Sequence, residues 1–112
     1  MHNTVQPSRV ADRPDDVFVL DIRPRYSYEE THIEGSHNLP VYDQVAGGNF
    51  IGLDASLEAV PDDEEIAVVC FSGSTAAVAA AYLRERGYDA KPLAGGIAGW
   101  NGPAAGTAVP SQ

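Results

Sequence analysis

The chain contains 112 residues, of which 44% are hydrophobic, so it is long and apolar enough for one domain with a real core, and the composition as a whole argues against a disordered tail as the nature of the chain. Sixteen acidic and seven basic residues give a net charge of −9, which argues against nucleic acid or an anionic membrane surface as a partner. No apolar run is long enough to span a membrane, and residues 1–5 lack the basic and hydrophobic regions of a secretory signal.

The cysteine content bears on the compartment and on metal binding. Cys70 is the only cysteine, so an internal disulfide is excluded and a reducing cytoplasm is the expected location. One cysteine and three widely spaced histidines form no metal-binding pattern, and no cofactor is expected. An acidic composition with Lys91 as the only lysine also suggests a high-salt cytoplasm, with ordinary surface solvation as the alternative.

The first part of the chain predicts short strands separated by turns and a short helix. Residues 4–16 are polar and predict an edge strand near Val5 followed by an irregular turn. The apolar run at residues 17–20 predicts a central strand. A short helix is expected at residues 26–30, and a very short strand around residues 38–39.

The middle of the chain contains the clearest strand–loop–helix unit. After the glycine-containing stretch 41–54, a short helix is expected at residues 56–60, with Asp54 as its N-cap. Residues 66–69 (Ile-Ala-Val-Val) predict a strand that is covered on both faces. Residues 76–86 are rich in good helix formers and predict a helix that Gly87 caps.

The last part of the chain predicts one more strand and a short helix. A strand is expected at residues 90–93, a tight turn at residues 94–96 and a helix at residues 97–101. Residues 102–112 show no periodicity and are expected to form a flexible tail. Strands that alternate with helical segments predict a single α/β domain over residues 1–112, with a core over about residues 5–101 and a small, about five-stranded parallel sheet covered by helices on both faces.

Cys70 is the candidate reactive residue, because it lies where a parallel strand ends and a helix begins. In open α/β sheets, ligands bind at this edge. The backbone N–H groups of such a loop, together with the positive end of the helix, stabilise an anion at the centre of the loop. A thiol in this position ionises more readily than a free one, which favours a reactive cysteine over a buried hydrophobic one.

Three stretches together resemble a rhodanese domain, the fold of a family of sulfurtransferases. Residues 20–40 resemble the family pattern of Asp-x-Arg, an aromatic residue and then Gly-His-Ile-x-Gly-Ala-x-Asn-Ile-Pro. Residues 69–75 (Val-Cys-Phe-Ser-Gly-Ser-Thr) resemble its six-residue active-site loop, and residues 93–100 match its closing Leu-x-Gly-Gly-x-x-x-Trp motif. The three motifs occur in order between residues 17 and 100, which makes the resemblance specific to the fold.

The resemblance implies that Cys70 takes a sulfane sulfur as a persulfide and passes it to a nucleophilic acceptor. Its substrate would be held by the loop residues Phe71, Ser72, Gly73, Ser74 and Thr75. Backbone N–H groups of this loop and the three hydroxyls are suitable donors to a persulfide, although helix capping is an alternative role for the hydroxyls.

Two further motifs of the resemblance have structural interpretations. Asp21 and Arg23 resemble the family's Asp-x-Arg and are expected mainly to order the loops around the site. His32 is expected to shape the turn to Gly35, and Trp100 to lie in the core.

The sequence departs from the thiosulfate-active members of the family. These members carry basic residues just after the cysteine and a further substrate-binding arginine that aligns with Ser27. Arg25 is the candidate replacement for that arginine. Thr31 stands where glycine is usual. With few cations around Cys70, efficient turnover of thiosulfate is not expected.

The same residues argue against two other enzyme functions and leave one non-enzymatic alternative. A related phosphatase class has a longer loop that ends in arginine where this chain has Ala76, which argues against phosphoryl transfer. A thioredoxin-like role fails without a second cysteine. The remaining alternative is a non-enzymatic interaction or sulfur-carrier module that acts with a partner protein. The expected partners are therefore a small sulfur donor (thiosulfate or a persulfide), a thiol acceptor and a sulfur-relay protein, with the chain as a monomer.

Overall fold

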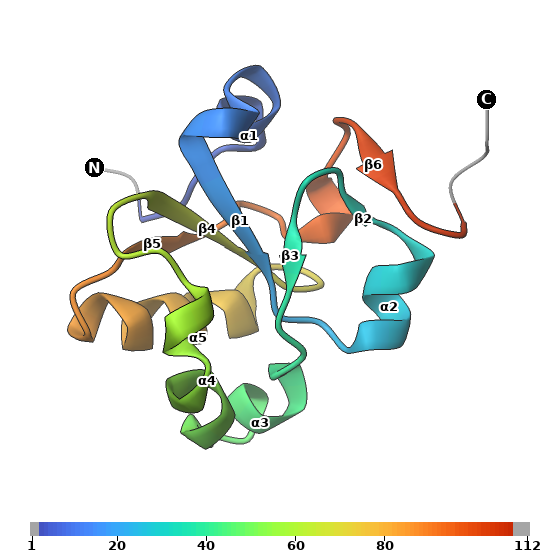
Figure 1. Ribbon diagram of the computed structural model, residues 1–112. Helices are drawn as coiled ribbons and strands as arrows, with labels where there is room; N and C mark the ends of the chain where they lie inside the picture. Colours follow the sequence, from blue (N-terminus) through green and yellow to red (C-terminus); the bar gives the residue numbers. More distant parts are fainter. Residues whose placement is uncertain (1–2, 109–112) are drawn as a thin grey trace.

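The computed structural model describes residues 3–108, which fold around a parallel four-stranded sheet (Figure 1). The strand order is β3 (His37–Asn38), β1 (Val17–Asp21), β4 (Glu65–Val69) and β5 (Asp89–Pro92). Val5 adds a parallel bridge to Leu93 just beyond β5. The parallel α/β sheet predicted from the sequence is confirmed, but it has four strands rather than about five, because Val5 forms a single bridge at its edge instead of a strand.

Helices cover both faces of the sheet. One hydrophobic cluster contains buried residues of α3 (Tyr42–Ala46), α4 (Ile51–Ala55) and α5 (Ser74–Glu85), and the other includes Val10 of α1 (Pro7–Asp12). The remaining helical segments are η1 (Pro14–Asp16), α2 (Arg25–Glu30), η2 (Leu57–Ala59) and η3 (Ile97–Gly99). The predicted arrangement with helices on two faces is therefore present.

The central strand β4 is buried on both faces. Ile66 and Val68 pack into the cluster that contains α5, whereas Ala67 and Val69 pack into the opposite cluster. This alternation follows from the two-residue period of a strand. All four side chains are fully buried, which explains why the apolar run at 66–69 was a reliable strand signal.

Helix α5 begins and ends at glycines with positive φ. Gly73 is the N-cap residue with φ +112°, and Gly87 follows the helix with φ +94°. Tyr88 N–H then donates to Leu83 O at 3.1 Å, closing the last turn. Small buried side chains of α5 allow the helix to pack closely on the sheet, namely Ala76, Ala79 and Ala80.

Two local predictions before β4 were wrong. Residues 7–12 form α1 rather than an irregular turn; Pro7 at its first position has the φ that a helix start needs. Asp54 lies inside α4 and does not cap a helix at residues 56–60. Within residues 56–60 only the 3₁₀ helix η2 forms, and Ser56 lies between the end of α4 and the start of η2.

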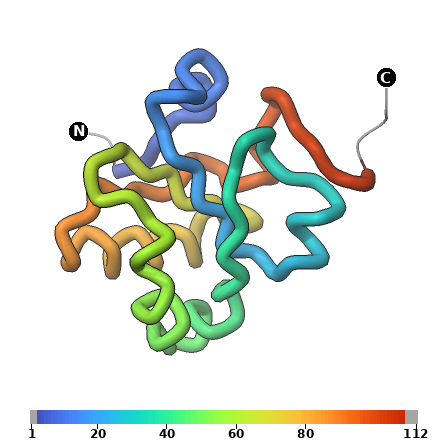
Figure 2. Tube along the Cα trace, in the orientation of Figure 1, coloured from blue at the N-terminus to red at the C-terminus, as the bar shows by residue number. Residues whose placement is uncertain are grey.

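The segment after residue 101 differs from the flexible tail predicted from the sequence. Ala104–Ala105 form β6, which pairs antiparallel with β2 (His32–Ile33). Thr107 and Ala108 N–H groups then donate to the carbonyls of Glu29 and Glu30 at 2.9 and 2.7 Å. Figure 2 shows the C-terminal segment running beside residues 29–33. Residues 109–112 of the predicted tail lie outside the described residues.

Trp100 was predicted to lie in the core, and the structure places it partly buried against the cluster around Val10 and Ile33. Its indole N–H donates to Pro103 O at 3.0 Å. We expect Trp100→Ala to lower the free energy of unfolding by about 2 kcal/mol, less than the about 3–5 kcal/mol of a fully buried tryptophan. Urea unfolding measures the change, and Trp100→Phe is the milder control. An unchanged unfolding midpoint would exclude Trp100 from the packing.

Within residues 3–108, no helix is both long and apolar enough to cross a membrane.

Candidate active site

Cys70 follows β4 directly and is 1% exposed. Its sulfur accepts hydrogen bonds from two backbone N–H groups, those of Gly73 at 3.0 Å and Ala76 at 3.3 Å. Ala76 is the third residue of α5, a position whose N–H normally bonds to an N-cap side chain. Gly73 is the N-cap residue and has no side chain, so the thiol occupies that role. The helix N-terminus and the loop therefore both direct positive partial charge at one sulfur.

Of the predicted loop residues, Gly73 bonds to this sulfur, and the side chains of the others differ in their exposure. Phe71, Ser72 and Ser74 are exposed, and Gly73 and Thr75 are partly buried. Phe71 is 37% exposed, and its ring meets the ring of Tyr42 edge-on at 4.9 Å between centroids. Tyr42, from α3, is a neighbour of the loop that sequence analysis missed, because no local pattern connects the two rings.

The turn at residues 94–99 is bonded to the active-site loop through backbone hydrogen bonds. Ile97 N–H donates to Cys70 O at 2.9 Å, and Ala98 N–H donates to Phe71 O at 3.2 Å. Gly96 has φ +58°, and a Cβ built on it would lie 2.7 Å from Phe71 O and 2.8 Å from Cys70 O. The tight turn predicted at residues 94–96 is present, and its backbone approaches the active-site loop so closely that Gly96 has no room for a side chain.

Asp21 and Arg23 form a buried ion pair at the end of β1. Asp21 is fully buried and Arg23 is 3% exposed. The guanidinium donates from Nε to Oδ1 at 3.0 Å and from Nη2 to Oδ2 at 2.8 Å, and Nη2 also donates to Thr31 O at 2.7 Å. The pair therefore ties β1 to the start of β2. This geometry agrees with the loop-ordering role expected for the two residues.

The charge of Arg23 is directed at Asp21 rather than at Cys70. Its guanidinium carbon lies 5.8 Å from the centroid of the Phe71 ring. Asn38 reinforces the arrangement, because its side-chain amide donates to Asp21 O and Arg23 O at 2.9 Å each. Sequence analysis did not assign a role to Asn38, although its place in the motif next to a strand end was the available signal.

The residues that depart from the family pattern have separate environments. Arg25 is exposed at the first position of α2 and joins none of the four ion pairs formed among residues 3–108. Ser27 is 8% exposed. Thr31 has φ −158°, an extended backbone that any residue adopts, so the usual glycine is not required there. His32 Nδ1 lies 2.6 Å from Tyr28 O and its ring stacks on Tyr28, as a structural histidine does.

The structure describes no set of three His, Cys, Asp or Glu side chains in residues 3–108 that could hold a metal ion.

The protein is therefore an α/β domain with a parallel sheet and a cysteine site. Backbone N–H groups hold the thiol where a strand ends and a helix begins. A family model described as "Rhodanese-like domain" matches residues 6–103, and the chain belongs to this family. The thiosulfate sulfurtransferase GlpE of Shewanella oneidensis is 35% identical over 86 residues, which are 76% of each chain.

Other similar proteins extend the comparison. The adenylyltransferase and sulfurtransferase MOCS3-2 of Zea mays is 30% identical over 93 residues, which are 82% of this chain but only 19% of the maize protein. A crystal structure of a rhodanese-related protein from Thermoplasma volcanium superimposes with a TM-score of 0.78 at 21% identity, covering 93% of this chain and 98% of the other. The family and fold predicted from the sequence are thus confirmed, and the relatives include sulfurtransferases.

Proposed function

We propose that this protein is a sulfurtransferase that carries a sulfane sulfur as a persulfide on Cys70. The observation that carries the proposal is the pair of N–H donors on the thiol, from Gly73 at 3.0 Å and Ala76 at 3.3 Å. N–H groups that bond to the cysteine sulfur in this way are also suited to stabilise a persulfide anion. Ser72 lies on the loop, Ser74 and Thr75 lie in the first turn of α5, and all three offer hydroxyl donors to the outer sulfur.

The reaction has two nucleophilic steps. The Cys70 thiolate attacks the sulfane sulfur of a donor; with thiosulfate, the donor S–S bond breaks, sulfite leaves with the electron pair, and Cys70–S–S⁻ remains. An acceptor thiolate then attacks the outer sulfur of the protonated persulfide, which forms an acceptor persulfide and returns the Cys70 thiolate. No net oxidant or reductant is consumed, and the protein supplies anion stabilisation at both steps.

The charges around Cys70 favour a persulfide donor over free thiosulfate. Thiosulfate is a dianion, whereas the side chains that follow Cys70 are the uncharged Phe71 and Ser72. Arg23 is neutralised by Asp21, so the exposed Arg25 is the proposed cation for an anionic donor. The similarity to sulfurtransferases such as MOCS3-2 supports a protein thiol in a sulfur relay as donor or acceptor. A reducing cytoplasm, where a single thiol stays free, is the location we propose.

Intact-mass spectrometry tests this function directly. The protein is incubated separately with thiosulfate and with glutathione persulfide, and we expect a mass gain of one sulfur atom that cyanide or a thiol removes. The adduct should form more readily with the persulfide than with thiosulfate. If no donor adds sulfur to the wild-type protein, the enzyme proposal fails and a non-enzymatic interaction module takes its place.

A further inference from the structure

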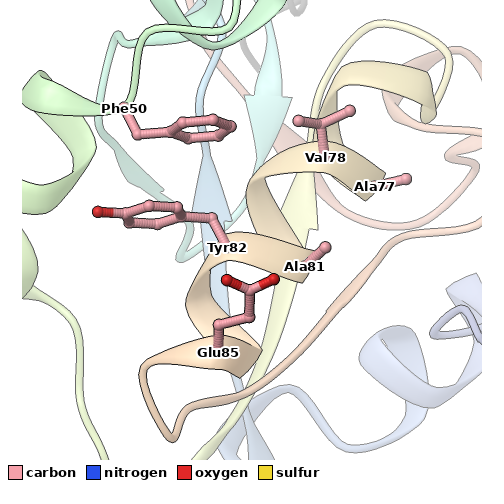
Figure 3. Close-up of a pocket in the computed structure, with 6 residues that line it drawn as sticks. All are labelled: Phe50, Ala77, Val78, Ala81, Tyr82 and Glu85. Carbon is pink, nitrogen blue, oxygen red and sulfur yellow. The ribbon is translucent and has the colours of Figure 1, made fainter.

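A groove on the outer face of α5 begins beside the active-site loop (Figure 3). It has a volume of about 420 Å³, and its lining is mostly apolar, consisting of Phe50, Ala77, Val78, Ala81, Tyr82 and Glu85. Ala76 N–H bonds to the Cys70 sulfur, and the next residue, Ala77, already lines the groove. From Ala77 to Glu85 the groove follows α5 for about 12 Å.

The floor of the groove is held in place by aromatic and polar contacts. The rings of Phe50 and Tyr82 stack at 4.5 Å between centroids with an interplanar angle of 1°. The Tyr82 hydroxyl donates to Asp54 Oδ1 at 2.7 Å, and this hydrogen bond raises the pKa of Tyr82 above its ordinary value. The Tyr82 hydroxyl therefore links α5 to α4, and it also accepts a hydrogen bond from Arg86 Nη2 at 2.9 Å.

Large apolar side chains are exposed on this side of the molecule. Among residues 3–108, four large hydrophobic side chains are exposed, and three of them lie on the active-site loop, α4 or α5. These three are Phe71, Ile51 at 77% exposure and Val78 at 46%. Ile51 borders a second hollow that shares Phe50 and Tyr82 with the groove. Val78 and Ile51 therefore lie at hollows with shared walls, and exposed apolar side chains grouped in this way mark interaction surfaces.

The charges around the groove select the kind of partner. Residues 41–60, which include α3 and α4, contain three acidic side chains and no basic one; of the three, Asp54 is paired with Arg86 at 3.5 Å. Glu85 lines the groove and joins none of the four ion pairs among residues 3–108, and the whole chain carries a net charge of −9. Two copies of this chain would repel each other, whereas a basic protein would be attracted.

We propose that this groove is the docking site for a basic protein that exchanges sulfur with Cys70, inserting an apolar side chain beside Val78 and placing a lysine or arginine at Glu85. The proposal rests on the proposed function, because it supplies the sulfur donor or acceptor of the same thiol. Cys70 is 1% exposed, so a protein thiol has to be guided to the loop to react. Docking along α5, next to the loop, provides that guidance.

A synthetic peptide thiol serves as the probe for such a partner. It carries one cysteine flanked by leucines and arginines, and a control peptide has glutamates in place of the arginines. Both are compared with dithiothreitol as acceptors of sulfur from persulfidated Cys70. We expect transfer to the basic peptide to be about tenfold faster than to the acidic one and to slow as KCl is added.

Two matched pairs of variants locate the docking site. Ala81→Gln puts a long neutral side chain into the groove, and Ala11→Gln makes the same change on the exposed part of α1. Glu85→Arg reverses a charge in the groove, and Asp12→Arg makes the same change in net charge on α1, which packs on the opposite face of the sheet. The groove variants should slow transfer to the basic peptide at least fivefold while transfer to dithiothreitol is unchanged. If both members of each pair behave alike, the docking proposal is overturned.

The failure of this proposal is distinguishable from failure of the proposed function. The same basic peptide with serine in place of cysteine binds without sulfur chemistry, and fluorescence anisotropy measures its affinity for the wild type and the four variants. Affinity lost only with Ala81→Gln and Glu85→Arg supports the docking site even if no persulfide ever forms. Sulfur transfer without any effect of these two variants supports the enzyme and overturns the docking site. Self-association that Ala81→Gln abolishes would assign the groove to a second copy and overturn the proposal.

Discussion

Cys70→Ser is expected to lose sulfur transfer completely while the protein keeps its fold. The serine hydroxyl can accept the N–H groups of Gly73 and Ala76, which now bond to the sulfur at 3.0 and 3.3 Å. A hydroxyl does not ionise near neutral pH and cannot hold a sulfane sulfur, so the nucleophile is lost. Intact mass should show no adduct with either donor, and acceptor turnover should fall to the uncatalysed rate.

The comparison with Cys70→Ala tests the hydrogen-bond geometry itself. Alanine leaves both N–H groups without an acceptor in a buried position, at a cost of about 1–3 kcal/mol. Urea unfolding should therefore show Cys70→Ala to be less stable than Cys70→Ser. Equal stability of the two variants would mean that the sulfur contributes no structural hydrogen bonds. An adduct that persists in Cys70→Ser would place the reactive group elsewhere.

The unit around Cys70 could be predicted from the sequence because each of its signals is local. An apolar run with β-branched residues identifies β4, and Gly73 and Gly87 mark the ends of α5. The cysteine lies between this strand and this helix. The short strand β5 and the Gly-Gly turn were also recognisable from adjacent residues. Since strands that alternate with helices pair in parallel, the parallel sheet and its reactive edge could be inferred as well.

The parts that escaped prediction depend on contacts between residues far apart in the chain. Strand β6 exists because residues 104–105 pair with β2, about seventy positions earlier, and a sequence of Ala, Gly and Pro carries no sign of that pairing. The edge-on contact of Tyr42 with Phe71 likewise joins two segments without a shared pattern. Asp54 is of a residue type that often caps helices, but its carboxylate accepts a hydrogen bond from the Tyr82 hydroxyl instead.

Gly96→Ala is expected to damage both stability and sulfur transfer. Gly96 combines φ +58° with ψ −156°, a conformation essentially restricted to glycine. The new Cβ would also lie 2.7 Å from Phe71 O and 2.8 Å from Cys70 O, both of them rigid backbone atoms. Relief of the contact requires the active-site loop to move away from the turn that donates to Cys70 O and Phe71 O. We expect a loss of about 3 kcal/mol in the free energy of unfolding.

Gly48→Ala is the matched control for this substitution. Gly48 also has positive φ, at +82°, but a Cβ there meets nothing within 4 Å. It should cost only about 1 kcal/mol, the strain of a left-handed alanine without a steric clash. Urea unfolding measures both variants, and the rate of persulfide formation at Cys70 should fall sharply in Gly96→Ala alone. Equal losses in the two variants would show that backbone strain dominates. In that case the contact between the turn and the Cys70 loop would not position the thiol.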